Sequence, residues 1–267
     1  MLLRLGQPPL CPKVIKLHDW IENKRSFVLI MEYPEPCHTL NQHIMYSDNM
    51  NEGKACWLIC QLIQAVKHCF DRGVFHGDIH TGNILLTDHS LELKLIDFGC
   101  AHPISSEGNL SSEYRGAPLC TPPEVIRNIT FHANPAYVWA VGAVLFEILH
   151  GYLPFESQDK ILRGYVQAKP TLSSACRDLI FQCLIRNPAN RLMLQHLEEH
   201  RVVRLTPQPE QDDSELMPAP SPFRITPTAD IDAADPELVR LPGQVCEDVE
   251  SLGKRQTQIW RIMSRRL

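Results

Sequence analysis

The chain has 267 residues, of which 44% are hydrophobic and 21% charged, a composition that excludes collagen-like, coiled-coil and wholly disordered proteins. Its formal net charge of −5 gives no overall positive field, so we expect no nucleic-acid partner. The ten cysteines are spread through apolar segments, which predicts reduced thiols packed in a core rather than a disulfide framework.

From the sequence we expect neither a secretion signal nor a membrane span. Arg4 interrupts the first apolar run too early for a signal peptide, and the best apolar stretch, residues 138–149, is too short to cross a bilayer. The sequence therefore predicts a cytoplasmic or nuclear protein without a membrane span, which we expect to be a monomer.

The first hundred residues alternate between strand-like and helix-like segments. In chain order, we predict a strand at 14–20, a strand at 26–33, a helix at 52–70, and a pair of strands at 84–87 and 91–96. The polar joint at 22–25 suits a hairpin between the first two strands. Pro34 and Pro36 end the second strand because proline cannot donate to a sheet.

The second half predicts helices followed by a different kind of sequence. A serine-rich loop at 105–116 precedes predicted helices near 136–149, 173–184 and 192–201. From 204 to 246, frequent prolines and acidic residues predict a disordered linker, because such a segment buries too little apolar surface to offset its ordering entropy. The last segment, 247–267, is expected to form a helix with a basic end. Residues 1–203 are thus the predicted folded domain.

The most informative block runs from residue 74 to residue 99. Asp78 and Asn83 are separated by four residues in a loop that enters a strand, a spacing at which a carboxylate meets a substrate hydroxyl while an amide oxygen reaches a magnesium ion. Asp97 offers another hard oxygen ligand at the end of the next strand. Phosphoryl transfer needs such parts, because it depends on positioning and on charge neutralisation.

Several segments in the same order carry a resemblance to a known family. They are Ser-Phe-Val-Leu-Ile-Met-Glu-Tyr-Pro-Glu-Pro at 26–36, Leu-Lys-Leu-Ile-Asp-Phe-Gly at 93–99, Pro-Pro-Glu at 122–124, Val-Trp-Ala-Val-Gly at 138–142 and Pro-Phe-Glu at 154–156. The sequence resembles the eukaryotic protein kinases, and within them the Pim family of Ser/Thr kinases, over about residues 12–203. This resemblance implies an α+β protein-kinase-like fold, mainly the helical C-lobe with the hinge and the last N-lobe strands. It also implies transfer of the ATP γ-phosphate to a protein Ser/Thr hydroxyl with Mg²⁺, and so a protein substrate or partner.

The resemblance assigns catalytic and metal-binding roles by position. Asp78 would orient and deprotonate the acceptor hydroxyl, while Asn83 and Asp97 would hold Mg²⁺. His80 stands where the family has a lysine that contacts the γ-phosphate, and it is shorter and largely neutral near pH 7.

The resemblance also places five residues around adenine. Met31 would be the gatekeeper and Glu32 would offer its carbonyl, with Leu85 and Ile96 below the ring. Pro34 has no N–H, so the usual second hinge donor is absent.

The chain departs from the family at several positions. No Gly-rich loop, strand lysine or αC glutamate precedes Pro12. Gly77 replaces an arginine that ties the catalytic loop to a phosphorylated activation loop, so switching by loop phosphorylation is not expected. Ala117 replaces a threonine that hydrogen-bonds the catalytic aspartate. Gly82 and Arg115 replace acidic positions that attract basic substrates, which predicts a weakened preference for them.

Three interpretations therefore stay open: an active kinase, a catalytically impaired pseudokinase or interaction module, and a chain whose Met1 is an incorrect start or belongs to one isoform. The hairpin at residues 14–33 would otherwise leave an apolar edge in water.

Simpler structural interpretations apply to the remaining features. We expect His76 to pack against Phe98, and Glu124 to form a buried pair with Arg191. Core packing is favoured over a shared metal for the cysteines at 56 and 60, and a polar helix face over a zinc site for His-Leu-Glu-Glu-His at 196–200. The arginines at 261, 265 and 266 are interpreted as a solvated helix end.

Overall fold

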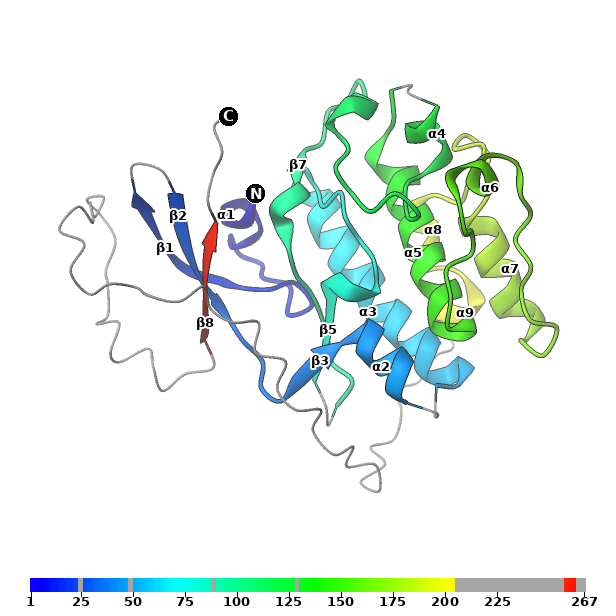
Figure 1. The fold of residues 1–267 in the computed structure, drawn as a ribbon, viewed down its shortest axis with the longest axis horizontal. Coiled ribbons are helices and arrows are strands. Elements are labelled where there is room, and N and C mark those ends of the chain that lie inside the picture. Colours follow the sequence, from blue (N-terminus) through cyan, green and yellow to red (C-terminus); the bar gives the residue numbers. More distant parts are fainter. Residues whose placement is uncertain (24–25, 48–49, 88–89, 128–129, 205–256, 263–267) are drawn as a thin grey trace. The chain divides into compact units, whose positions relative to one another are not determined.

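The computed structural model describes residues 1–23, 26–47, 50–87, 90–127, 130–204 and 257–262 (Figure 1). They belong to two compact units. The first combines Met1–Val14 with Cys37–Glu210, and the second combines Ile15–Pro36 with Gln211–Leu267. Each unit is considered by itself below.

The second unit contains a three-stranded antiparallel sheet in the order β1-β2-β8. Strands β1 (Leu17–Asn23) and β2 (Ser26–Glu32) form the predicted hairpin. β1 begins three residues later than predicted, because Val14 makes an isolated parallel bridge with Leu95 in the first unit instead. The hairpin prediction is thus confirmed with a shift at its start.

The third strand of this sheet is β8 (Thr257–Ile262), and it corrects the prediction of a helix at 247–267. Six of those residues are extended and pair with β2. Threonine, isoleucine and tryptophan favour strands once a neighbouring strand offers its main chain, and an isolated sequence does not reveal that neighbour. The remainder of that segment, and the predicted linker apart from Arg204, lie outside the described residues.

The first unit is mostly helical. Its helices are α1 (Leu2–Leu5), α2 (Leu40–Tyr46), α3 (Glu52–Asp71), α4 (Pro123–Ile126), α5 (Ala133–His150), α6 (Gln158–Arg163), α7 (Ser174–Cys183), α8 (Leu194–Leu197) and α9 (Arg201–Arg204). Strands β3 (Cys37–Thr39), β5 (Ile84–Thr87) and β6 (Leu93–Leu95) form one small antiparallel sheet, and β4 (Val74–Phe75) pairs with β7 (His102–Pro103). Short 3-10 turns are η1 (Thr81–Asn83), η2 (Phe98–Cys100) and η3 (Ser111–Glu113).

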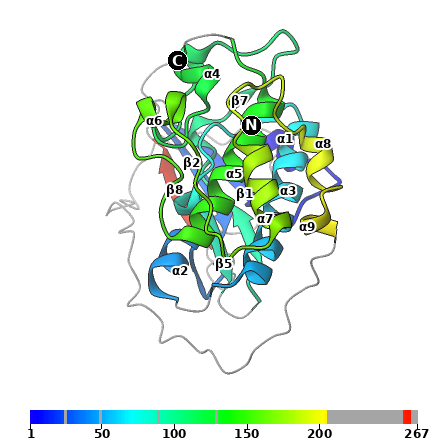
Figure 2. The same ribbon diagram turned by 90° about the vertical axis from the view of Figure 1, so that its right-hand side faces the viewer.

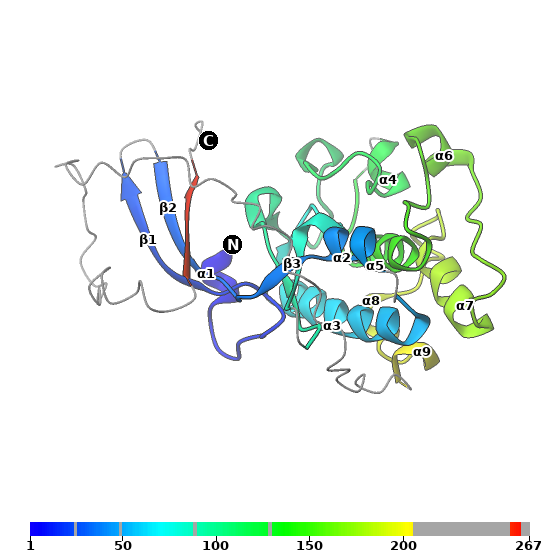
Figure 3. The ribbon, with the colours of Figure 1, turned by 60° about the horizontal axis from the view of Figure 1, so that its bottom comes forward.

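The core of this unit forms where α3 packs against α5, and α5 against α7 (Figures 2 and 3). Helix α3 begins where the Asn51 side chain accepts the Lys54 N–H at 2.8 Å, and the chain leaves it through Gly73 at φ +65°. Helix α5 is buried over most of its surface and ends at Gly151, also at positive φ. Both helices confirm the predictions to within three residues at either end. No helix among the described residues is long and apolar enough to cross a bilayer.

The single helix predicted at 192–201 is wrong, because the chain forms the two short helices α8 and α9 there. The Val202 N–H donates to Nδ1 of His200 at 3.4 Å, and His200 Nε2 faces Asp178 Oδ2 at 3.2 Å. A side chain that accepts a main-chain N–H in this way favours a helix start over a helix interior. The polar segment at 196–200 is therefore split between α8 and the turn that follows it.

Candidate active site

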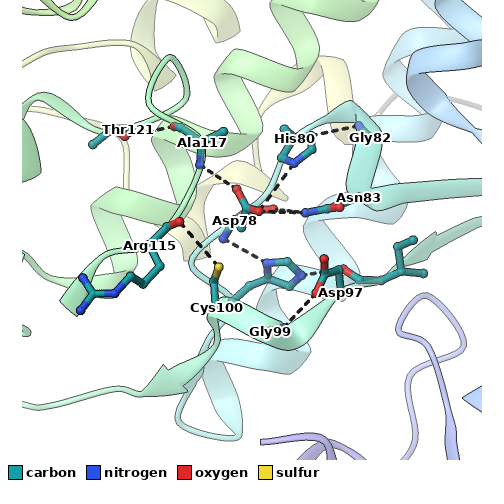
Figure 4. A network of polar contacts seen from close by, with 12 residues as sticks. Asp78, His80, Gly82, Asn83, Asp97, Gly99, Cys100, Arg115, Ala117 and Thr121 are labelled. Atoms are coloured by element: carbon teal, nitrogen blue, oxygen red, sulfur yellow. Dashed lines mark hydrogen bonds and ion pairs between the residues drawn. The ribbon is translucent and has the colours of Figure 1, made fainter. Parts of the chain in front are cut away.

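Two loops of the first unit bring the predicted polar residues together (Figure 4). The loop after β4 carries Asp78 and leads into η1, which ends at Asn83. Asp97 follows β6 and begins η2. The Ile96 N–H donates to the Asn83 carbonyl at 3.0 Å, so the end of the second loop is fixed against the end of the first.

Asp78 is held by donors on both carboxylate oxygens. Oδ1 accepts the Ala117 main-chain N–H at 2.8 Å, and Oδ2 accepts the Asn83 Nδ2 at 3.2 Å. Burial alone would raise the pKa of Asp78, but the neighbouring His80 and the Ala117 N–H outweigh it, and the pKa is lowered. The carboxylate is therefore ionised at neutral pH and has a fixed orientation.

Ala117 shows how this chain positions its aspartate without the threonine of the family pattern. The Ala117 N–H reaches the carboxylate, and the Ala117 carbonyl in turn accepts the Thr121 hydroxyl at 3.1 Å. A main-chain donor thus holds a carboxylate oxygen of Asp78 although the threonine hydroxyl of the family pattern is absent.

His80 lies beside Asp78 in a defined orientation. Its Nδ1 accepts the Gly82 N–H at 3.1 Å, which puts the proton of the neutral ring on Nε2, and Nε2 lies 3.7 Å from Asp78 Oδ2. Asp78 raises the pKa of His80, and burial opposes the rise only in part. The carboxylate of Asp78 thus favours the charged form of the imidazole.

Asn83 and Asp97 provide the oxygen atoms suited to a divalent cation. Asn83 uses its Nδ2 on Asp78, which leaves its carbonyl Oδ1 as the candidate ligand atom. Asp97 is exposed, has left-handed backbone angles (φ 58°, ψ 79°), and binds the Gly99 N–H through Oδ1 at 3.0 Å. Within the described residues no three His, Cys, Asp or Glu side chains gather into a metal-binding group. One amide and one carboxylate fit Mg²⁺, which binds proteins through few ligands and completes its shell with phosphate and water.

His76 braces the loop from below, as predicted. The buried ring contacts Phe98 edge-on at 4.6 Å between centroids, and its Nε2 bonds to the Ile96 carbonyl at 2.9 Å. Its Nδ1 accepts the Asp78 N–H at 3.2 Å. Burial lowers the pKa of His76 to about 4, so the ring stays neutral and acts by packing and hydrogen bonding.

Tyr137 is a contributor that the sequence reasoning missed. From α5, its hydroxyl accepts the His76 N–H at 2.8 Å and donates to the Val74 carbonyl at 2.7 Å. The only available signal was a tyrosine inside an apolar helix, since a buried hydroxyl needs partners.

Gly77 occupies a position that a larger residue cannot take in this backbone. Its φ is +82°, and an added Cβ would lie 2.7 Å from the Cys100 carbonyl oxygen. A Cβ at Gly116 would in turn overlap the Gly77 carbonyl. The catalytic loop and the segment around Arg115 therefore touch through their main chains, and Cys100 Sγ adds a 3.7 Å contact to the Arg115 carbonyl.

Comparison with known proteins decides the family. A model of the protein kinase domain matches residues 3–203. The chain belongs to the protein kinase family. The expected α+β kinase-like fold is confirmed with it.

The curated relatives are protein kinases, two of them named as serine/threonine kinases. The chain is 30% identical to Serine/threonine-protein kinase pim-2 of Danio rerio over 188 residues, covering 70% of this chain and 60% of that kinase. It is 30% identical to CBL-interacting protein kinase 1 of Oryza sativa subsp. japonica (77% of this chain, 47% of that kinase). It is 33% identical to CBL-interacting serine/threonine-protein kinase 21 of Arabidopsis thaliana (68% and 44%). The chain thus spans 60% or less of the length of each of these kinases. Its sequence identity to the Pim kinase is no higher than its identity to the other two kinases.

The kinase-type ion pair predicted between Glu124 and Arg191 is confirmed. Two guanidinium nitrogens donate to the two carboxylate oxygens at 2.8 Å each, and the side chains are 1% and 0% exposed. The Arg191 guanidinium also lies over the Trp139 ring at 5.0 Å. This pair connects α4 to the segment that follows α7 and, through Trp139, to α5.

The five residues predicted around adenine are divided between the two units. Met31 and Glu32 end β2 and Pro34 follows, all in the second unit, while Leu85 on β5 and Ile96 after β6 lie in the first. An adenine-binding slot formed by the residues of both units stays a prediction. Within its own unit, the Glu32 carboxylate accepts the Lys16 N–H at 3.0 Å.

Proposed function

We propose that this protein kinase family member transfers the γ-phosphate of ATP to a Ser or Thr hydroxyl of a protein. The observation that supports the proposal most strongly is the fixed, ionised Asp78 carboxylate beside the candidate Mg²⁺ ligands Asn83 and Asp97. Magnesium, when bound by those two residues, neutralises phosphate charge during transfer.

The chain's own residues have distinct tasks in this reaction. Asp78 accepts a hydrogen bond from the acceptor hydroxyl, orients its oxygen toward the phosphorus, and takes the proton as the new O–P bond forms. At the same time the bond between the γ-phosphorus and the β–γ bridging oxygen of ATP breaks, and ADP leaves with that electron pair. Two N–H donors hold the carboxylate, so little reorganisation is needed at that moment. His80, polarised by Asp78, supplies partial positive charge near the phosphates in place of a lysine.

A second function has its own support. His80 is shorter than the lysine it replaces, and Gly77 removes the arginine that reads a phosphorylated activation loop. Both changes favour a protein that keeps the kinase fold but acts as an interaction module with little or no phosphotransfer.

Two measurements on the same variants separate these functions. We expect the chain to incorporate labelled phosphate from ATP into a protein acceptor with Mg²⁺, and to show a rise in melting temperature with Mg-ATP, since ligands of the native state stabilise it. Asp97→Asn should abolish incorporation, and Asp71→Asn, an exposed carboxylate at the end of α3, should not change it. Incorporation no higher than that of Asp97→Asn would reject the transferase, and absence of the thermal shift as well would favour the interaction module.

Location and assembly belong to the same proposal. The sequence supports a monomer that works in the cytoplasm or nucleus on protein partners. Light scattering of the purified chain and imaging of a tagged chain test these two points, and a stable oligomer or a secreted product would contradict them.

A further inference from the structure

The middle strand of the second unit, β2, is paired along both edges (Figures 1 and 3). One edge holds β1, its neighbour in sequence, and the other holds β8, from near the end of the chain. The β2–β8 register is continuous over six residues, from the pair Phe27 and Ile262 to the pair Glu32 and Thr257. Segments far apart in the sequence therefore share one small sheet.

The alternation of the β2 main chain shows which of its N–H and C=O groups hydrogen-bond to β8. The Glu32 N–H donates to the Lys16 carbonyl on the β1 side. In antiparallel pairs, the N–H and C=O groups of every second residue point to the same edge. The groups that point to β8 therefore belong to Phe27, Leu29 and Met31.

An empty β2 edge would be a serious liability. Residues 27–31 read Phe-Val-Leu-Ile-Met, an uncharged apolar run of the kind that pairs with other chains when its main chain is unpaired. A two-stranded hairpin is also only marginally stable on its own in water, whereas a third strand stabilises it. The hairpin thus needs a partner strand at this edge.

We propose that the β2 edge is a strand-binding site whose ligand is the chain's own segment Thr257–Ile262. Main-chain hydrogen bonds supply the affinity in this recognition mode, and the sequence Thr-Gln-Ile-Trp-Arg-Ile is rich in residues that favour strands. Covalent attachment makes the pairing intramolecular, which favours it over pairing with a second copy at low concentration. The inference goes beyond phosphotransfer and does not depend on it.

Two proline variants of the full chain test the site. Gln258 pairs with Met31, so its N–H points to β2, whereas Arg261 pairs with Val28 and its N–H points to the outer edge. Gln258→Pro removes a donor to β2, and Arg261→Pro is the matched control because proline is tolerated where the N–H faces outward. Hydrogen exchange read by NMR should accelerate about tenfold or more at Phe27, Leu29 and Met31 in Gln258→Pro and stay near the parent rate in Arg261→Pro.

The same hydrogen-exchange spectra distinguish the results that support the proposed strand-binding site from those that overturn it. Recovery of protection on adding about 1 mM of a free peptide with the sequence of residues 255–264 would support a binding site. Unchanged exchange in Gln258→Pro would overturn the proposal, as would equal acceleration in both proline variants. Loss of protection throughout α3 and α5 would also overturn it, since the substitution would then act on the whole fold. A parent chain that is a dimer, and becomes a monomer with Gln258→Pro, would assign the strand to a second copy and reject the intramolecular ligand.

Discussion

The main-chain N–H of Ala117 donates to Oδ1 of Asp78 at 2.8 Å, in a position where the family pattern has a threonine hydroxyl. The orientation of the carboxylate thus depends on the path of the backbone through residues 115–117. That path is fixed by close main-chain packing, since Gly116 lies against the Gly77 carbonyl and Cys100 Sγ contacts the Arg115 carbonyl. Glycines at this junction are therefore part of how the site is built.

Gly77→Ala is expected to destabilise the protein more than Gly151→Ala. Both glycines have φ near +80°, so both substitutions incur the cost of a left-handed alanine, about 1–2 kcal/mol. Only at Gly77 does the added Cβ meet a main-chain oxygen, 2.7 Å away on Cys100, whereas no atom of the described residues lies within 4 Å of a Cβ at Gly151. Urea unfolding measures the loss in free energy of unfolding for each variant. The difference between the two losses is the cost of the overlap between the added Cβ and the Cys100 oxygen. Equal losses would show that the loop moves apart freely.

Substitutions at two glutamines of α3, buried Gln61 and exposed Gln64, are expected to differ in their effect on stability. Gln61 is 1% exposed, donates to the Leu91 carbonyl at 2.9 Å, and accepts the Leu93 N–H at 3.0 Å. Gln61→Leu leaves both main-chain groups unpaired and should lower the free energy of unfolding by about 1–3 kcal/mol for each. Exposed Gln64→Leu should change it by less than about 0.5 kcal/mol. A small change in the free energy of unfolding for Gln61→Leu would mean that water takes over the hydrogen bonds of the Gln61 amide.

The sequence predicted well the parts that follow from local pattern. The apolar periodicity of α3 and α5 located both helices, because each buries its own stripe or surface whatever its neighbours are. The spacing of Asp78 and Asn83 also placed them correctly in one loop, since η1 is a local turn. The buried pair of Glu124 and Arg191 followed from the family resemblance.

The parts that were missed depend on partners distant in the sequence. Strand β8 is extended because β2 offers an edge, and its strand-favouring residues do not by themselves show where in the sequence that partner lies. The Ala117 donor is a main-chain group, which carries no residue-type signal. Tyr137 acts at the site only because α5 packs below the loop that carries His76.

Breaking the buried ion pair is expected to be among the most damaging single changes. Glu124→Gln leaves Arg191 charged and 0% exposed at its side chain, which costs about 3–5 kcal/mol when a buried partner is lost. The exposed pair of Asp159 and Arg163 is the control, and Asp159→Asn should change stability by less than about 0.5 kcal/mol. Thermal and urea unfolding compare the two. Similar effects of both substitutions would mean that α4 opens and hydrates Arg191.

His76 predicts a specific loss of stability in mild acid. Its pKa is about 4 in the folded protein and 6.5 in a solvated chain, because burial disfavours the charged ring. As the pH falls from about 6.5 toward 4, the unfolded state takes up a proton that the folded state does not, so the free energy of unfolding decreases. The decrease attributable to this ring is about 3 kcal/mol and levels off below pH 4.

The difference between the parent chain and His76→Gln isolates that contribution, since all other titrating groups are shared. Urea unfolding at a series of pH values should show the parent's advantage over His76→Gln shrinking as the pH drops from 7 to 4. The advantage at neutral pH reflects the hydrogen bond to the Ile96 carbonyl and the contact with Phe98, which glutamine reproduces only in part. A constant difference across that range would show that the ring takes up a proton without opening the fold, and that water reaches the base of the catalytic loop.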